Sequence, residues 1–161
     1  CYYDFSNREL KYAKWNGDNW NVEIIDNGCD SSQYERQFEI SLALDVNDIP
    51  HIGYYYFDCD GPNVLKYATL SNNNWNIVTV DSTSEDVGDY LSLVLDSYGH
   101  PHISYIDETN KILKYSYLTG GNWKTETIDN VGFGAGTSIA LDDDNNPHIV
   151  FLMEINGILK L

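Results

Sequence analysis

Residues 90–129 read YLSLVLDSYGHPHISYIDETNKILKYSYLTGGNWKTETID, and the order of the short motifs in this stretch decides the fold. Within it, Pro-His-Ile precedes Leu-Lys-Tyr, which precedes Asn-Trp and a closing Ile-Asp. The same motifs recur in the same order on both sides. The Leu-Lys pair begins at residues 10, 65, 113 and 159, so its spacings are 55, 48 and 46 residues. The chain is therefore a tandem repeat.

Each repeat predicts four short strands. The first is Ile40–Asp45 or its counterpart, the second is Pro101–Asp107 or its counterpart, the third contains Leu-Lys-Tyr, and the fourth runs from Trp to Asp. Proline stands at the first position of the second strand, where its missing N–H does least harm. Residues that accept positive φ separate the third and fourth strands: Asn16-Gly17-Asp18, Asn72-Asn73 and Gly120-Gly121. Such short links predict an antiparallel meander.

The first strand of a repeat has two unlike faces. Leu93 and Leu95 lie on one face, and the smaller Ser92, Val94 and Asp96 lie on the other. This alternation is typical of a strand that is covered on both sides, with little room on one. Four-stranded meanders of about 45–50 residues that stack face to face are the blades of a β-propeller. The sequence therefore predicts an all-β fold of propeller-type blades.

Counting strands predicts a single repeat array over 1–161 with incomplete ends. Residues 1–26 form a partial blade, 38–81 and 90–129 form blades, and 137–161 form a second partial blade, about three and a half blades in all. A closed propeller needs at least four blades. Unfinished blades expose strand edges that can pair with another chain. We therefore expect further blades of a longer chain, or copies of itself in a ring or fibre, as partners.

The repeat resembles the Ser-Leu-Ala-Leu-Asp…Pro-His-Ile-Ser-Tyr…Leu-Lys-Tyr-Ala repeat of large secreted prokaryotic β-propeller proteins. Its segments stand here at 41–45, 101–105 and 65–68, and the resemblance covers nearly the whole chain. It implies a protein that is extracellular or on the cell surface. The repeat is more loosely similar to propeller lectins, which share a third-strand Leu-x-Tyr, a glycine turn and a fourth-strand Trp. That likeness implies glycans as an alternative class of partner.

The charge balance excludes two classes of partner. The chain has 9 basic and 25 acidic side chains and a net charge of −16. Such a surface repels nucleic acid backbones and anionic lipid headgroups. The sequence also lacks a run of 18 apolar residues, so we expect no membrane insertion.

Two residue types recur once per repeat. His51, His102 and His148 hold one position, which favours a structural hydrogen bond between strands over a metal ligand or general base. The second set is Trp20, Trp75 and Trp123. Each Trp either packs on the outer part of its blade or offers a flat apolar face to a sugar ring.

The turns and the longest link carry the remaining candidates. Asp142, Asp144 and Asn146 are candidate calcium ligands, although side-chain hydrogen bonds to the turn backbone explain them equally well. No other cofactor is predicted. The link Asp26–Phe38 breaks the repeat, and its Cys29, Glu35 and Arg36 are candidate assembly contacts. Cys1, Cys29 and Cys59 allow one disulfide plus a free or intermolecular thiol.

The sequence argues against catalysis. It has no nucleophile motif, no phosphate-binding glycine loop and no Cys-x-x-Cys. Catalysis also requires one site to differ from its repeats, whereas binding and assembly can use identical units. We therefore expect a non-catalytic structural or interaction module. The alternative is a lectin-like glycan-binding module, and a weaker one is a glycan-processing enzyme that uses paired carboxylates.

Overall fold

The computed structural model describes residues 1–28, 39–155 and 158–160, except the side chains of 133–135 and 153–160. The described chain is all β. Its fourteen strands are β1 (Tyr2–Asp4), β2 (Glu9–Trp15), β3 (Trp20–Asn27), β4 (Ile40–Leu44), β5 (Pro50–Tyr56), β6 (Val64–Ser71), β7 (Asn74–Asp81), β8 (Val87–Leu95), β9 (Pro101–Asp107), β10 (Ile112–Thr119), β11 (Asn122–Asn130), β12 (Phe133–Leu141), β13 (Pro147–Ile155) and β14 (Ile158–Lys160).

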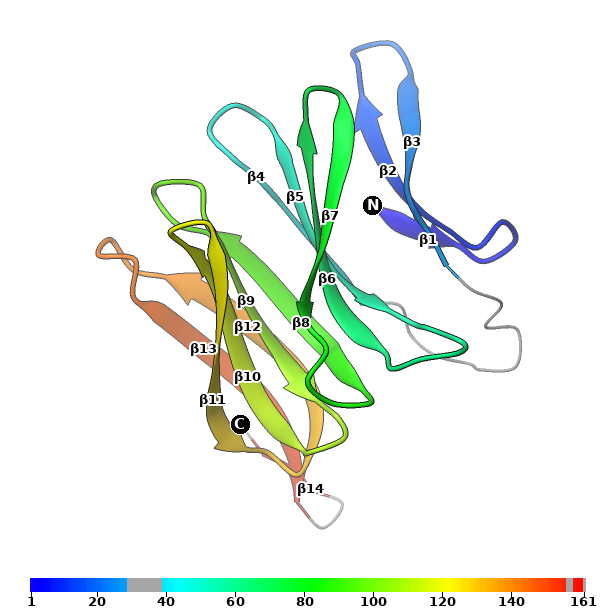
Figure 1. Ribbon diagram of the computed structural model, residues 1–161. Helices are drawn as coiled ribbons and strands as arrows, with labels where there is room; N and C mark the ends of the chain where they lie inside the picture. Colours follow the sequence, from blue (N-terminus) through cyan, green and yellow to red (C-terminus); the bar gives the residue numbers. More distant parts are fainter. Residues whose placement is uncertain (29–38, 156–157, 161) are drawn as a thin grey trace.

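The strands form four antiparallel sheets that follow one another in chain order (Figure 1). The first sheet is β1–β3, the second β4–β7, the third β8–β11 and the fourth β12–β14. The predicted fold is confirmed: these are propeller-type blades, about three and a half in number, with three strands at each end. None of the described residues forms a helix that could cross a membrane.

The hairpin turns adopt the backbone that their residues predict. Gly17, Asn72, Asn73, Gly120 and Gly121 all have positive φ, between 50° and 107°. Glycine and asparagine tolerate this region because they avoid or offset the Cβ clash that disfavours it for other residues. These turns join the third strand of a blade to its fourth and so fix the register in which Trp and Asp are placed.

The core lies between the sheets. The first strands β4, β8 and β12 stack on one another at the inner edge. The largest apolar cluster joins the second and third sheets and includes Tyr55, Leu65, Leu93 and Ile103. A second cluster joins the first and second sheets around Leu10, Tyr12, Ile52 and Tyr54. The sheets thus bury their facing surfaces against one another rather than under a helix layer.

The small face of each first strand allows the next sheet to approach closely. The backbone N–H of Leu93 donates to Ser41 Oγ at 3.0 Å, and that of Ile139 donates to Ser92 Oγ at 3.3 Å. The serine of one inner strand therefore satisfies an edge N–H of the next. This explains why the alternation of Leu with Ser recurs in the repeat.

Candidate functional site

The repeated histidines join strands within a blade. His51 Nδ1 lies 2.5 Å from the Tyr67 hydroxyl, and His102 Nδ1 lies 2.5 Å from the Tyr115 hydroxyl. Burial lowers the pKa of both histidines and raises the pKa of Tyr67 and Tyr115 to about 12. The neutral rings therefore accept hydrogen bonds from the tyrosines. His148 differs: it is 70 % exposed, with Nε2 3.6 Å from Asp142 Oδ2.

The lowered histidine pKa predicts a loss of stability in mild acid. An unfolded histidine takes up a proton at pH about 6.5, whereas the folded His51 and His102 resist protonation. The neutral histidines therefore make their full contribution to the free energy of unfolding above pH 6.5. Below that pH the free energy of unfolding decreases, by at most about 1.4 kcal/mol per pH unit for each histidine. Urea unfolding between pH 7 and 5 measures this slope. We expect His102→Gln to reduce the slope, and an equal slope in this variant and the native protein would contradict the assignment.

The repeated tryptophans differ in their surroundings. Trp75 packs edge-on against Tyr12 of the preceding sheet, with ring centroids 5.5 Å apart, and Trp123 packs in the same way on Tyr67 at 5.3 Å. Trp20 has no such neighbour in the described chain: it contacts Trp15 of its own sheet and is 65 % exposed. Trp75 and Trp123 are therefore joint residues between blades, and Trp20 alone offers its face to solvent.

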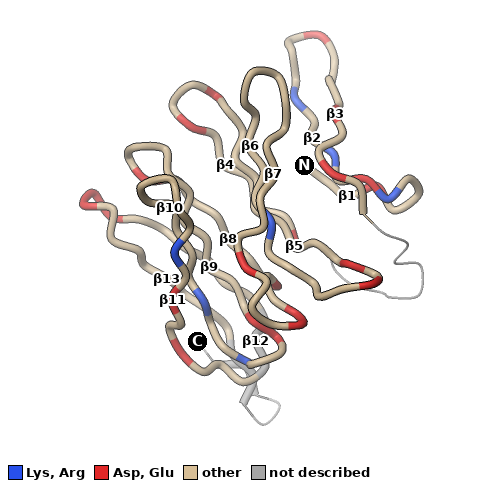
Figure 2. The backbone as a smooth tube through the Cα atoms, viewed as in Figure 1, with Lys and Arg blue, Asp and Glu red and all other residues tan. Residues whose placement is uncertain are grey.

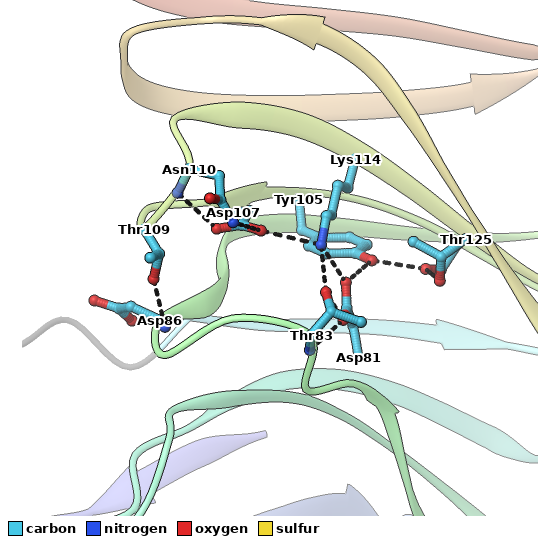
Figure 3. A network of polar contacts seen from close by, with 10 residues as sticks. Asp81, Thr83, Asp86, Tyr105, Asp107, Thr109, Asn110, Lys114 and Thr125 are labelled. Carbon is cyan, nitrogen blue, oxygen red and sulfur yellow. Dashed lines mark hydrogen bonds and ion pairs between the residues drawn. The ribbon is translucent and has the colours of Figure 1, made fainter.

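A polar triad accompanies each tryptophan joint, and Figure 3 shows the one between the second and third sheets. At the joint of the second and third sheets, Asp81 ends β7 and accepts a hydrogen bond from the Tyr105 hydroxyl at 2.7 Å. Lys114 Nζ of β10 lies 3.0 Å from the carboxylates of both Asp81 and Asp107. Asp26, Tyr54 and Lys66 repeat this arrangement one joint earlier, at 2.7 and 2.9 Å. We call this set the Asp–Tyr–Lys triad.

The triad of the third sheet is deeply buried. The side chains of Lys114, Asp81 and Asp107 are 8 %, 1 % and 0 % exposed. Burial alone would raise the pKa of Asp81, but hydrogen bonds from Thr83, Tyr105 and Lys114 outweigh it and leave that pKa below its usual range. Burial likewise opposes the charged form of Lys114, whose two carboxylate partners hold its pKa above the ordinary value. The three groups are therefore charged together and serve a structural purpose.

The described side chains of the last joint depart from this pattern. Phe151 of β13 stands where Tyr54 and Tyr105 stand, so it has no hydroxyl to donate. Asp129, at the end of β11, is exposed and accepts a hydrogen bond from the Asn130 N–H at 2.7 Å. The repeats are thus not equivalent in the way their motifs suggest.

An acidic cleft opens beside the joint of the second and third sheets. It holds about 520 Å³ of water-accessible space and is shallow and widely open to solvent. Its lining residues are Glu85, Asp86, Asp89, Tyr90, Glu108, Thr109 and Lys111. Burial first, and then the carboxylates of Glu108, Asp89 and Glu39, raise the pKa of Tyr90, so its hydroxyl keeps its proton and can donate. Lys111 forms an ion pair with Glu108.

Irregular backbone places these side chains. The register of β8 shifts between Val87 and Asp89 and again between Asp89 and Ser92. Gly88 and Tyr90 both have positive φ, 109° and 53°. Bulges of this kind turn side chains out of the regular alternation of a strand. The start of β8 therefore contributes Asp89 and Tyr90 to the cleft lining, and Tyr90 also packs against the apolar cluster of Ile106, Leu113 and Val131.

Asp86 holds the walls of the cleft together. Its carboxylate accepts hydrogen bonds from the hydroxyl of Tyr55 in β5 at 2.7 Å and from Nδ2 of Asn63, just before β6, at 3.2 Å. Its backbone N–H donates to Oγ1 of Thr109, in the turn between β9 and β10, at 2.8 Å, a contact that Figure 3 also shows. Residues of two blades thus fix one residue of the link, and the cleft is preformed rather than assembled by a ligand.

A second pocket lies at the joint of the first and second sheets. It measures about 310 Å³ to its mouth, but only about 10 Å³ is wide enough for the centre of a water molecule. Tyr3, Tyr54, Tyr56, Phe57 and Asp26 are among its lining residues. Lys66 Nζ lies 3.3 Å from the centre of the Tyr56 ring, where a cation is attracted to the ring face. This pocket is a packed crevice with too little room for a sugar ring.

The remaining candidates are turn and link residues. The Asp142 carboxylate accepts hydrogen bonds from the N–H groups of Asp144 and Asn146 and from Asn146 Nδ2, so its oxygens close the turn. In the described part of the chain, no group of three or more His, Cys, Asp or Glu side chains could hold a metal ion. Cys59 is disulfide-bonded and the exposed Cys1 is a free thiol. The predicted contacts Cys29, Glu35 and Arg36 lie outside the described residues.

Sequence reasoning missed the triad and the cleft. The residues of the triad recur in the sequence. The lysine belongs to Leu-Lys-Tyr, the aspartate closes the fourth strand, and the tyrosine follows Pro-His-Ile after one intervening residue. The repeat, however, does not show that these three meet across a joint. The cleft had a weaker signal, the glycine at 88, which recurs together with its preceding valine as Val131-Gly132.

Comparison with known proteins gives a distant likeness. No protein-family model matches the sequence, and no curated protein matches it significantly. Among solved structures, it is similar to a fucose lectin from Kordia zhangzhouensis, determined in complex with methyl-fucoside. The two are 18 % identical, the match covers 75 % of this chain and 82 % of the lectin, and the TM-score is 0.47. At that distance the likeness assigns no ligand to this chain.

Proposed function

We propose that this chain is a non-catalytic carbohydrate-binding module and that its site is the acidic cleft between the second and third sheets. The preformed cleft supports this proposal, because it combines an aromatic ring with carboxylates on a rigid framework. Sugar hydroxyls donate well to carboxylates, and the apolar face of a sugar ring packs on an aromatic side chain. Tyr90, Glu85 and Asp89 supply these groups at a shallow surface cleft of about 520 Å³ that is open to solvent.

Charge narrows the class of sugar. Four carboxylates, Glu85, Asp86, Asp89 and Glu108, line the cleft together with one lysine. The whole chain carries a net charge of −16, and Figure 2 marks the acidic and basic positions along the described backbone. Uronic acids, sialic acids and sulfated glycans are therefore repelled, and a neutral or amino sugar is the expected ligand.

Calorimetric titration with neutral, amino and acidic monosaccharides, followed by a glycan array, tests the proposal. We expect binding of a neutral or amino sugar, weakened about tenfold or more by Glu85→Gln or Tyr90→Phe, since each removes one hydrogen-bonding group. Asp143→Asn makes the same charge change at an exposed turn outside the cleft and is the matched control. No binding at millimolar sugar, or equal binding by all variants, would refute the assignment.

A second role, as an interaction module within a larger array of blades, rests on a different observation. Apolar residues on one face of the first sheet, Trp20 among them, are exposed. The equivalent face of the second and third sheets is buried. The carbohydrate cleft and this face lie on different sheets, so the two roles are independent.

A further inference from the structure

One face of the first sheet is exposed and apolar. Residues paired across antiparallel strands share a face. The register pairs Tyr2 with Lys11, Lys11 with Ile24, Ala13 with Val22, and Trp15 with Trp20. The exposed fractions on this face are Tyr2 44 %, Trp15 51 %, Trp20 65 %, Val22 50 % and Ile24 51 %. We call these five residues the open face.

The preceding sheet covers the equivalent face of the second and third sheets. Trp75 and Trp123 take the place of Trp20 and pack on Tyr12 and Tyr67. Ala68, the counterpart of Ala13, is completely buried. The open face is thus a third copy of a surface that the chain uses twice as a joint between blades.

The polar half of the joint is also present. Lys11 forms ion pairs with Asp4 at 2.5 Å and Glu9 at 2.9 Å in its own sheet. Lys114 pairs in the same way with Asp107 of its own sheet and additionally with Asp81 of the preceding one. The first sheet therefore holds the Tyr and Lys of a triad, Tyr2 and Lys11, and an incoming carboxylate would complete it.

We propose that the open face is a docking surface for a further blade of this same repeat. That blade presents a tyrosine of its third strand to Trp20 and a carboxylate from the end of its fourth strand to Tyr2 and Lys11. Continuity with the two joints inside the chain identifies the occupant, because both joints use these groups. A sugar fits less well, since the apolar surface continues past the tryptophans over Val22 and Ile24, which offer a hydroxyl-rich ring no polar partner.

The inner edge gives a second, independent observation. Leu42 and Leu44 of β4 are 41 % and 52 % exposed, whereas Leu93, the counterpart of Leu42, is 7 % exposed where β8 stacks on β4. The described first sheet has no strand at the position that β4 occupies in the second. A blade docked on the open face, followed by such an inner strand, covers Leu42 and Leu44 as β4 covers Leu93.

The repeat register defines the test. In an extended chain, a second copy of residues 87–149 is fused to the N-terminus of the intact protein. Cys1 then follows this copy at the position of Val150, and Tyr2 at the position of Phe151. The extended chain then offers the open face a blade with Tyr115 and Asp129, followed by an inner strand. We expect Trp20→Ala to lower the ratio of folded to unfolded protein about twofold in the native chain, where Trp20 is exposed. In the extended chain, where the added blade covers Trp20, we expect the same substitution to lower this ratio about a hundredfold or more. Leu42→Ala should show the same contrast.

Two controls and two contrary outcomes complete the experiment. Val46→Ala, at a turn residue that is 94 % exposed, should be neutral in both chains, and Trp75→Ala should be costly in both. Equal, small effects of Trp20→Ala in the two chains would overturn the proposal, as would an extended chain less stable than the native one. If light scattering shows that the native chain dimerises and Trp20→Asp separates the dimer, the occupant is a second copy and the blade is ruled out.

Discussion

Replacing Lys114 with methionine should cost about 3–5 kcal/mol of unfolding free energy, because it leaves Asp81 and Asp107 charged and buried without their shared cation. Lys114 bonds both carboxylates at 3.0 Å, and the two aspartates are 1 % and 0 % exposed. Methionine fills nearly the same volume, so the loss is electrostatic rather than a cavity. Urea unfolding at pH 7, monitored by tryptophan fluorescence, measures it.

Lys66→Met is the matched control for this prediction. Lys66 holds the same position one blade earlier, yet it is 17 % exposed and its partner Asp26 is 19 % exposed. Water screens this pair more strongly, so we expect a loss of roughly 1–2 kcal/mol. Asp81→Asn should recover part of the loss in the Lys114→Met background by removing one stranded charge. Equal losses at the two sites would mean that burial does not set the strength of the triad.

Gly88→Ala should be the second substitution with a large effect, lowering the free energy of unfolding by about 2–5 kcal/mol. A Cβ at residue 88 would lie 3.0 Å from both Cα and Cβ of Leu65, a completely buried residue. The φ of Gly88 is also +109°, which disfavours any side chain. The strained backbone accounts for about 1–3 kcal/mol and the clash with Leu65 for a similar amount.

Gly17→Ala separates the two causes. Gly17 has nearly the same φ, +107°, but a Cβ there would have no atom within 4 Å. Its substitution therefore measures the backbone cost alone, and thermal unfolding of the two variants gives the clash by difference. If both variants lose the same stability, the clash with Leu65 contributes nothing. The second and third sheets would then shift apart at Leu65 without loss of free energy. Gly88→Ala should also weaken sugar binding, since residues 89 and 90 line the cleft.

The strands were predictable because local chemistry sets them. Proline begins β5, β9 and β13, and the turn residues set where each third strand gives way to a fourth. The contacts between blades were not predictable, because they join residues of different repeats, from 24 positions apart for Tyr105 and Asp81 to 52 for Leu93 and Ser41. Periodicity assigns Trp20, Trp75 and Trp123 one role, whereas their exposure depends on whether a sheet lies in front of them.

The cleft was unpredictable for a different reason. A repeat directs attention to what recurs, and Asp89 and Tyr90 of β8 differ from the two residues that follow the corresponding Val131-Gly132 pair. Their side chains enter the cleft through two shifts of register in one strand. The sequence shows a glycine there, but only the backbone conformation shows which side chains the bulge redirects.

Each full blade carries both halves of its joints: Tyr and Lys on the face it turns to the preceding blade, and Tyr and Asp on the face it turns to the next. A genetic duplication or deletion of a whole repeat therefore creates a new junction that is already complementary. Such a chain can change in length during evolution without any compensating substitution at the seam. Phe151 breaks that rule, since a copy carrying it cannot supply the hydroxyl. Recombination through that repeat leaves a weaker seam than recombination through the other two.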